Sequence, residues 1–192
     1  MLRLILFSLV LVLGGCTDPK PQFISTDLSE AGFARDFALT DHNGQPRTLA
    51  DFRGKAVVIF FGYTQCPDVC PTTMTGMAEA MRQLGADAAK VQVLFVTVDP
   101  ERDTPQLLAQ YAPAFNPGFL GLYGDPQTIA QTAQEFRIFY KKQPGSAPDT
   151  YTVDHSAGSY AYDPQGRLRL YIKYGEKPEV IAKDLKLLLT SK

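Results

Sequence analysis

The feature that most constrains this chain is a stretch in which two cysteines directly follow an apolar run. Residues 57–61 read VVIFF, the β-branched and aromatic composition of a buried strand. Cys66 and Cys70 come next, and Pro71 suits the first turn of a helix. Two thiols are therefore expected where a strand ends and a helix begins. Backbone N–H groups and the helix dipole favour anions at such a place, thiolates included.

The N-terminal residues predict a processed, lipid-anchored protein. The apolar run over residues 4–13 follows a positive charge and is about half of the ~20 residues that a membrane-spanning helix needs. It ends in Leu-Gly-Gly before Cys16, which resembles a bacterial lipobox. We therefore predict a lipoprotein signal peptide over residues 1–15 and lipid attachment at Cys16. Ordinary signal cleavage and an uncleaved anchor are the alternatives.

All three interpretations of the N-terminus place the folded part outside the cytoplasm, where disulfides persist. The predicted location is the bacterial cell envelope, with a lipid anchor in the membrane and the domain on the periplasmic or other extracytoplasmic side. Cys16 is then bound to lipid, so that Cys66 and Cys70 are the only thiols left in the mature domain.

Length and charge limit the remaining possibilities. With 192 residues and a hydrophobic fraction of 45%, the chain has enough material for one domain with its own core. The formal net charge is -1 and no lysine or arginine block is present, so no nucleic-acid partner is expected. Residues 16–35 are polar and interrupted by prolines, which predicts a flexible tether. Residues 36–192 form the predicted domain.

The hydrophobic pattern along this domain predicts alternating strands and helices. The expected elements, in chain order, are a hairpin over 36–55, strand 56–62, a helix from 71 to about 85, strand 91–98, helix 106–115, strand 119–123, a helix from 126 to about 140, a surface loop over 141–150, an antiparallel hairpin over 158–171 and a helix from 178. Met74, Met77 and Met81 fall at helical core spacing and are expected to pack rather than to bind metal.

This order of elements predicts an α/β fold with a central mixed sheet flanked by helices. Strands that alternate with helices form a parallel core sheet, and the late hairpin adds antiparallel strands to it. A strand, a cysteine pair at the next helix start and a late hairpin with a closing helix resemble the thioredoxin fold. The hairpin over 36–55 is an N-terminal extension of that fold.

Cys66 and Cys70 have three conceivable uses. A structural disulfide across three residues would close too small a loop to restrict the unfolded chain much. Thiol–disulfide exchange is the second use, although thioredoxin-type oxidoreductases have two residues between their cysteines and this chain has three. Metal binding by two thiolates is the third, because residues i and i+4 lie on one face of a helical turn.

His155 favours a metal. In a thioredoxin-like topology the loop before the late hairpin faces the cysteine pair, whereas His42 lies in an Asp-His-Asn-Gly turn and is expected to be exposed. Two thiolates and one imidazole form a soft ligand set that suits Cu(I), and Cu(II) when water joins as a fourth ligand. Structural zinc usually takes four protein ligands. Asp99 and Asp154 are expected either to support the site or to act as caps and surface acids.

Three ordered segments give the chain a specific family resemblance. FGYTQCPDVCP, VTVDPERDTP and VDHSAGSYAYDPQGR resemble the three signature segments of the Sco/SenC family of copper proteins. The resemblance implies a thioredoxin-like, membrane-anchored protein that binds one copper ion, as Cu(I) or Cu(II), through CxxxC and the histidine of the DHS segment. In this chain those ligands are Cys66, Cys70 and His155. Many members begin with a transmembrane helix, and the lipobox-like segment here changes the anchor but not the site.

The same resemblance implies the function of a copper metallochaperone that serves assembly of the CuA centre of cytochrome c oxidase. The implied partners are oxidase subunit II, a copper donor and a thiol reductant. The alternative is a thiol–disulfide oxidoreductase that reduces the CuA-site cysteines with Cys66 and Cys70 as its redox-active pair. Only in the second case is the protein an enzyme. A peroxidase of the thioredoxin superfamily fits CxxxC and a distant histidine poorly.

Overall fold

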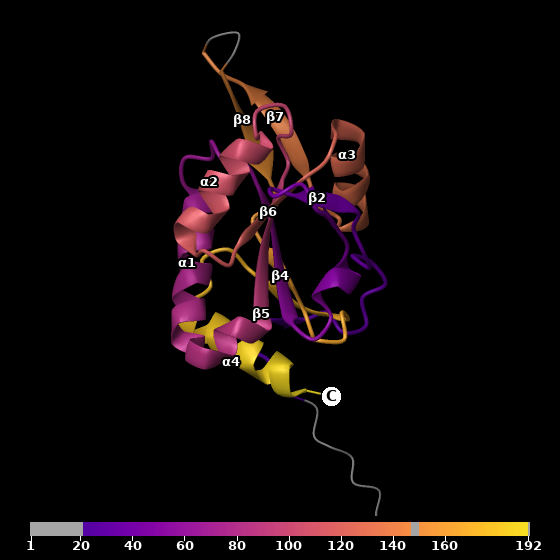
Figure 1. Ribbon diagram of the computed structural model, residues 1–192, viewed down its shortest axis with the longest axis vertical. Coiled ribbons are helices and arrows are strands. Elements are labelled where there is room, and N and C mark those ends of the chain that lie inside the picture. Colours follow the sequence, from indigo (N-terminus) through magenta and orange to yellow (C-terminus); the bar gives the residue numbers. More distant parts are fainter. Residues whose placement is uncertain (1–20, 147–149, 192) are drawn as a thin grey trace, which may run out of the picture.

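The computed structural model describes residues 21–146 and 150–191, and Figure 1 shows strands in the middle with helices around them. The elements in chain order are β1 (Thr26–Asp27), β2 (Leu39–Asp41), β3 (Pro46–Arg47), the 3₁₀ helix η1 (Leu49–Phe52), β4 (Ala56–Gly62), α1 (Val69–Leu84), the 3₁₀ helix η2 (Gly85–Lys90), β5 (Val91–Thr97), α2 (Pro105–Phe115), β6 (Leu120–Tyr123), α3 (Pro126–Glu135), β7 (Tyr140–Pro144), β8 (Tyr151–His155), β9 (Ser159–Tyr162), β10 (Leu168–Ile172) and α4 (Pro178–Thr190).

The main sheet has eight strands in the order β1-β10-β9-β4-β5-β6-β2-β3. Strands β4, β5 and β6 are parallel, and the others join antiparallel. Every residue of β4 and β5 is buried, which explains their continuous apolar composition. The predicted α/β architecture with a central mixed sheet is confirmed.

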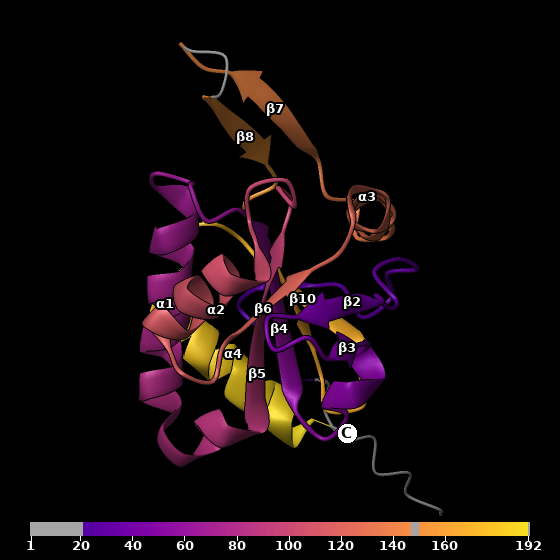
Figure 2. The ribbon, with the colours of Figure 1, turned by 45° about the horizontal axis from the view of Figure 1, so that its top comes forward.

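Helices cover both faces of this sheet. Figures 1 and 2 show α1, α2 and α4 on one side and α3 on the other. Because side chains alternate along a strand, neighbouring residues of β4 serve opposite layers. The ring of Phe60 packs beside Phe95, whereas the ring of Phe61 packs against Phe136, just after α3.

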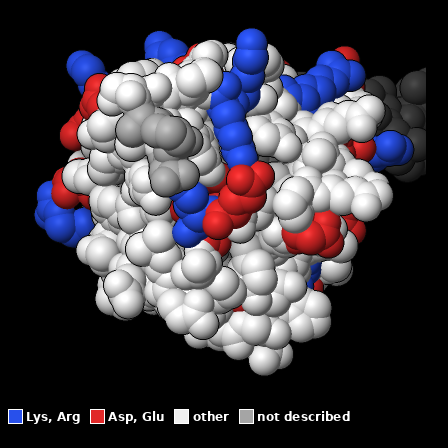
Figure 3. All heavy atoms as spheres, turned by 90° about the horizontal axis from the view of Figure 1, so that it is seen from above, with Lys and Arg blue, Asp and Glu red and all other residues white. Residues whose placement is uncertain are grey.

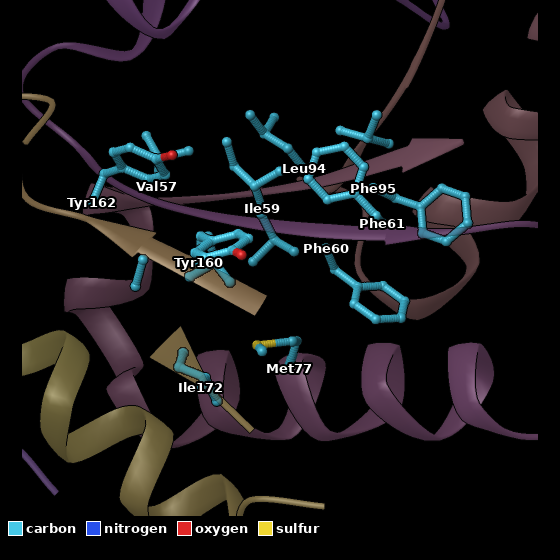
Figure 4. Packing of buried hydrophobic residues seen from close by; sticks show 14 of the residues in the cluster. Val57, Ile59, Phe60, Phe61, Met77, Leu94, Phe95, Tyr160, Tyr162 and Ile172 are labelled. Atoms are coloured by element: carbon cyan, nitrogen blue, oxygen red, sulfur yellow. The ribbon is translucent and has the colours of Figure 1, made fainter. Parts of the chain in front are cut away.

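The methionines of α1 belong to the core, as the sequence predicts. Met74, Met77 and Met81 are buried, and Figure 4 shows Met77 pointing from its helix towards the strands. Their burial assigns them to packing.

Helix starts agree with the sequence patterns to within two residues. Thr104 caps α2 through a hydrogen bond from the Leu107 N–H, and Asp125 caps α3 in the same way. Helix α1 begins at Val69, before Pro71, so that Cys70 lies inside its first turn. Helix α3 is shorter than predicted, because Arg137 adopts φ +53° in the left-handed region, which ends helices.

A second β-hairpin replaces part of the predicted loop over residues 141–150. Strands β7 and β8 pair antiparallel, from Tyr140 opposite His155 to Pro144 opposite Tyr151. The sequence YKKQP of β7 has no apolar alternation, so the pattern for a half-buried strand is missing. Figure 2 shows this hairpin projecting beyond the end of the main sheet.

The predicted tether also differs from the structure in its second half. Asp184, fully buried in α4, accepts hydrogen bonds from the backbone N–H groups of Ile24 (3.0 Å) and Ser25 (2.8 Å). Strand β1 pairs with β10, and the Tyr162 hydroxyl donates to the Ala34 carbonyl at 2.7 Å. These bonds fix residues 24–34 on the domain, which the polar composition did not indicate. The predicted signal peptide and Cys16 lie outside the described residues.

No helix within residues 21–146 and 150–191 has both the length and the apolar composition needed to cross a bilayer.

Candidate metal centre

The cysteine pair occupies the predicted junction between strand and helix. Cys66 lies in the loop after β4, and Cys70 lies in the first turn of α1. The backbone N–H of Cys70 donates to the Cys66 sulfur, with N and Sγ 3.4 Å apart. Both residues are thiols in the structure. The helix start therefore supplies a donor to one of the two sulfurs, as expected of a place that favours thiolates.

His155, the last residue of β8, completes the group. Its Nε2 lies 3.3 Å from the Cys70 sulfur. The ligand atoms of Cys66, Cys70 and His155 all lie within 4.8 Å of one another, close enough to contact a single ion. Residues 85 positions apart in the sequence are thus brought together by the fold.

The tautomer of His155 follows from its second hydrogen bond. Nδ1 lies 2.9 Å from the carbonyl oxygen of Ser156, which can only accept. We therefore assign the proton to Nδ1, which leaves the lone pair of Nε2 directed at the cysteines. Burial lowers the pKa of His155, so the neutral ring with its free lone pair is favoured.

The two cysteines differ in their environments. Cys70 is fully buried, and this burial raises the pKa of its thiol far above the ordinary value. The expectation that a helix start favours a thiolate therefore fails for Cys70 in the metal-free protein. Cys66 is only partly buried. One sulfur is thus open to an incoming reagent, and the other is sheltered.

This asymmetry predicts unequal alkylation. In the reduced, metal-free protein, iodoacetamide should label Cys66 at least about tenfold faster than Cys70, because only an accessible thiolate reacts readily. Peptide mapping by mass spectrometry measures the two rates separately. The unfolded chain is the control, in which both sites should react alike; equal rates in the folded protein would contradict the assignment.

Two aromatic rings pack against the histidine. The rings of Phe60 and Tyr63 meet the His155 ring edge-on, with centroid distances of 6.0 and 5.9 Å. The imidazole is therefore held by ring contacts on the body of the domain as well as by its own strand.

A buried carboxyl group supports the cysteine loop, and the sequence analysis missed it. Asp103 accepts hydrogen bonds from the backbone N–H (3.0 Å) and hydroxyl (2.6 Å) of Thr64 and from the hydroxyl of Thr97 (2.6 Å). It thereby ties the loop before Cys66 to the end of β5. Burial raises the pKa of Asp103. Asp103 lies within the segment VTVDPERDTP that the sequence analysis singled out. Its burial could not be predicted, because an acidic residue in a polar loop follows no sequence pattern that distinguishes a buried side chain from an exposed one.

The other acids and the second histidine have structural partners. Asp99 pairs with Arg102 and does not cap α2, a role that Thr104 takes. Asp154 is exposed and accepts a hydrogen bond from Gln143, so it is a surface acid of the hairpin. His42 was predicted to be exposed, and this is wrong: it is half-buried because its Nδ1 accepts the Gly121 N–H at 3.0 Å.

The end of the molecule that carries the hairpin is mixed in charge. Figure 3 shows it from above, with basic and acidic side chains interspersed among a larger uncharged area. Lys142 of β7 pairs with Glu101 at 2.6 Å on this part of the surface.

These observations define a class: a domain with helices on both faces of a mixed sheet and two thiols and one imidazole clustered at the end of a central strand. The chain matches the SCO1/SenC family over residues 25–190 and belongs to that family. Both the family and the thioredoxin-like fold that the sequence predicted are confirmed.

Three similar proteins illustrate the match. "Protein SCO2 homolog, mitochondrial" of Bos taurus is 40% identical over 153 residues, which are 79% of this chain and 58% of that protein. The structure of Bradyrhizobium japonicum ScoI with copper bound is 44% identical, covering 80% of this chain and 97% of that one, with TM-score 0.74. The crystal structure of a SCO1/SenC family lipoprotein from Bacillus anthracis is 26% identical, covering 80% of this chain and 92% of that one, with TM-score 0.68. This chain thus spans less than two thirds of the bovine relative's length.

Proposed function

We propose that this protein is a copper chaperone that binds one copper ion, as Cu(I) or Cu(II), and delivers it for assembly of the CuA centre in cytochrome c oxidase subunit II. The observation that carries the proposal is the cluster of Cys66, Cys70 and His155 ligand atoms within 4.8 Å of one another. This donor set fits copper, since thiolates select Cu(I) and imidazole suits copper in both states. The similar ScoI of Bradyrhizobium japonicum, whose structure holds copper, supports it.

The three residues would divide the work of holding and releasing the ion. Both thiols must lose their protons when copper binds, whereas Nδ1 of His155 already faces the Ser156 carbonyl and Nε2 already faces the Cys70 sulfur. Cys66, the accessible sulfur, is where a partner's thiolate would enter by ligand exchange. Cys70 is fully buried and would release the ion last.

The anchor and location are part of this proposal. We infer that Cys16 is acylated and that the domain faces the extracytoplasmic side. The lipobox-like sequence before Cys16 supports this, as does the similar lipoprotein of Bacillus anthracis. Mass spectrometry of the mature N-terminus tests it.

A second function is favoured by the unequal burial of the two cysteines. In thiol–disulfide exchange, the Cys66 thiolate would attack a disulfide in the CuA site of subunit II and form a mixed disulfide. Cys70 would then displace the partner's sulfur, leaving a Cys66–Cys70 disulfide and two partner thiols. Two electrons pass from this protein to its partner. Stoichiometric mixing of the metal-free dithiol with oxidised CuA domain tests this, with free thiols counted on each protein.

The decisive experiment for the chaperone is a copper titration of the reduced protein. We expect one equivalent of Cu(I) or Cu(II) to bind, with a thiolate-to-Cu(II) charge-transfer band in the second case. Cys66→Ser/Cys70→Ser is the control and should bind neither ion tightly. Failure of the unaltered, reduced protein to bind copper would refute the proposed function.

A further inference from the structure

The strand that carries His155 does not belong to the main sheet. Strands β7 and β8 form a two-stranded sheet of their own, which Figures 1 and 2 show projecting at one end of the molecule. Cys66 and Cys70, by contrast, lie in the main body, after β4 and in α1. The position of the imidazole relative to the sulfurs therefore depends on what fixes this hairpin to the body.

Arg102 makes the densest set of such contacts. Its Nε pairs with the Asp99 carboxylate, and its Nη1 donates to the backbone carbonyl of Tyr151 at 2.9 Å. The same Nη1 donates to the Gln65 side chain at 3.1 Å, next to Cys66. The guanidinium carbon lies 3.5 Å from the ring centroid of Tyr151, a close cation–π contact. One side chain thus joins the cysteine loop, the loop after β5 and the hairpin.

Asp99 and Tyr151 close this arrangement into a triangle. The Tyr151 hydroxyl donates to the second carboxylate oxygen of Asp99 at 2.7 Å. Asp99 is fully buried, and the Arg102 side chain is 17% exposed, so solvent screens these contacts only weakly. A lysine could keep the ion pair, but its donors all sit on one nitrogen, and it lacks the planar group that here reaches separate acceptors and stacks on a ring.

We propose that Arg102 is a positioning residue for the metal centre, holding β8 so that His155 stands within reach of Cys66 and Cys70. Tyr151 and His155 are the first and last residues of β8. Because β8 is paired with β7 along its whole length, fixing Tyr151 also restricts the position of His155. The inference rests on the proposed copper binding. It goes beyond the ligand set, since the partners of Arg102 are Asp99, Gln65 and Tyr151 rather than the ligands themselves.

The consequence is a selective effect on the two copper states. Cu(I) is held well by two thiolates: Cys70 lies in α1, and the loop that carries Cys66 is also held by the hydrogen bonds between Thr64 and Asp103, which do not involve Arg102. Cu(II) depends more on the imidazole, the ligand whose strand Arg102 fixes. Loss of Arg102 should therefore weaken Cu(II) binding and leave Cu(I) binding nearly intact.

The experiment compares Arg102→Ala and Arg102→Lys with the matched control Arg82→Ala. Arg82 also pairs with an acid three residues away, Glu79, but on the exposed surface of α1. Both Arg102 variants should bind Cu(II) about tenfold more weakly, the lower end of the effect of outer-shell partners on metal affinity. Their charge-transfer bands should shift, and Cu(I) affinity should stay within about twofold. Arg82→Ala should match the wild type throughout.

A metal-free measurement accompanies the titrations. Amide hydrogen exchange of the apo-protein should be faster in β8 of both Arg102 variants, and unchanged in β4 and β5. Where Arg102→Ala folds poorly, Tyr151→Phe removes only the hydroxyl bond to Asp99, and should give the same changes at smaller size.

The outcomes separate the two proposals. Wild-type Cu(II) affinity and wild-type exchange of β8 in the Arg102 variants would overturn the positioning role. Equal loss of Cu(I) and Cu(II) would overturn it too, since the damage would then be general. Failure of the wild type and Arg82→Ala to bind copper would refute the proposed function, and β8 exchange in the apo-protein would still decide the role of Arg102.

Discussion

The variant His155→Ala is expected to bind Cu(II) at least about 100-fold more weakly than the wild type, because it loses a direct ligand rather than an outer-shell partner. Its Cu(I) affinity should fall by no more than about tenfold, since both thiolates remain. In the metal-free protein the imidazole already lies beside the cysteines, with Nε2 3.3 Å from the Cys70 sulfur. Removing it leaves the cysteines in place but takes away the only nitrogen ligand of the cluster.

Competition titrations with chelators of known affinity measure both constants, and the charge-transfer band reports the Cu(II) ligands. His42→Ala is the matched control, because it removes the chain's other histidine, which hydrogen-bonds to Gly121 away from the cluster. It should bind both ions like the wild type. A His155→Ala protein with wild-type Cu(II) affinity and spectrum would show that the ligand assignment is wrong.

Much of the fold was predictable because its central strands and helices have clear patterns. The run VVIFF is short, apolar and rich in β-branched and aromatic residues, which predicts a buried strand, and β4 extends over the predicted residues 56–62. Prolines and capping residues marked the starts of α2 and α3 for the same local reasons. The ligand cluster was predictable because few residue types supply soft ligands, and the chain has only three cysteines and two histidines.

The rest depends on contacts that no local pattern encodes. Strand β7 is polar, and pairing with β8 rather than burial makes it a strand. The polar segment before residue 36 looks like a tether, yet the carboxylate of Asp184, 159 residues from Ser25, holds it on the domain. Asp103 and Arg102 likewise stand in a loop whose composition is that of an exposed segment. In each case the structure of the segment is set by a hydrogen bond, an ion pair or strand pairing with a residue outside it, and the local composition does not show that partner.

Gly62→Ala is expected to damage both stability and copper binding, because the glycine makes room for the Cys70 sulfur. A Cβ at this position would lie 2.7 Å from Cys70 Sγ and 3.0 Å from ring carbons of Phe60 and Phe95. All three neighbours are fully buried and cannot swing into solvent. We expect the free energy of unfolding to fall by about 1–3 kcal/mol, the usual cost of overpacking a core.

Displacement of the Cys70 sulfur should change copper binding in Gly62→Ala differently from the loss of the imidazole in His155→Ala. Because Cys70 would bind copper in both oxidation states, Cu(I) and Cu(II) affinities should each fall at least about tenfold, whereas His155→Ala loses mainly Cu(II). Gly76→Ala is the matched control: a Cβ added at Gly76 in α1 would meet nothing within 4 Å, so alanine should stabilise the helix by about 0.5–1 kcal/mol. Denaturant unfolding and chelator competition measure the two effects. Wild-type stability and copper affinity in Gly62→Ala would mean that the absence of a side chain at Gly62 does not determine where the sulfur lies.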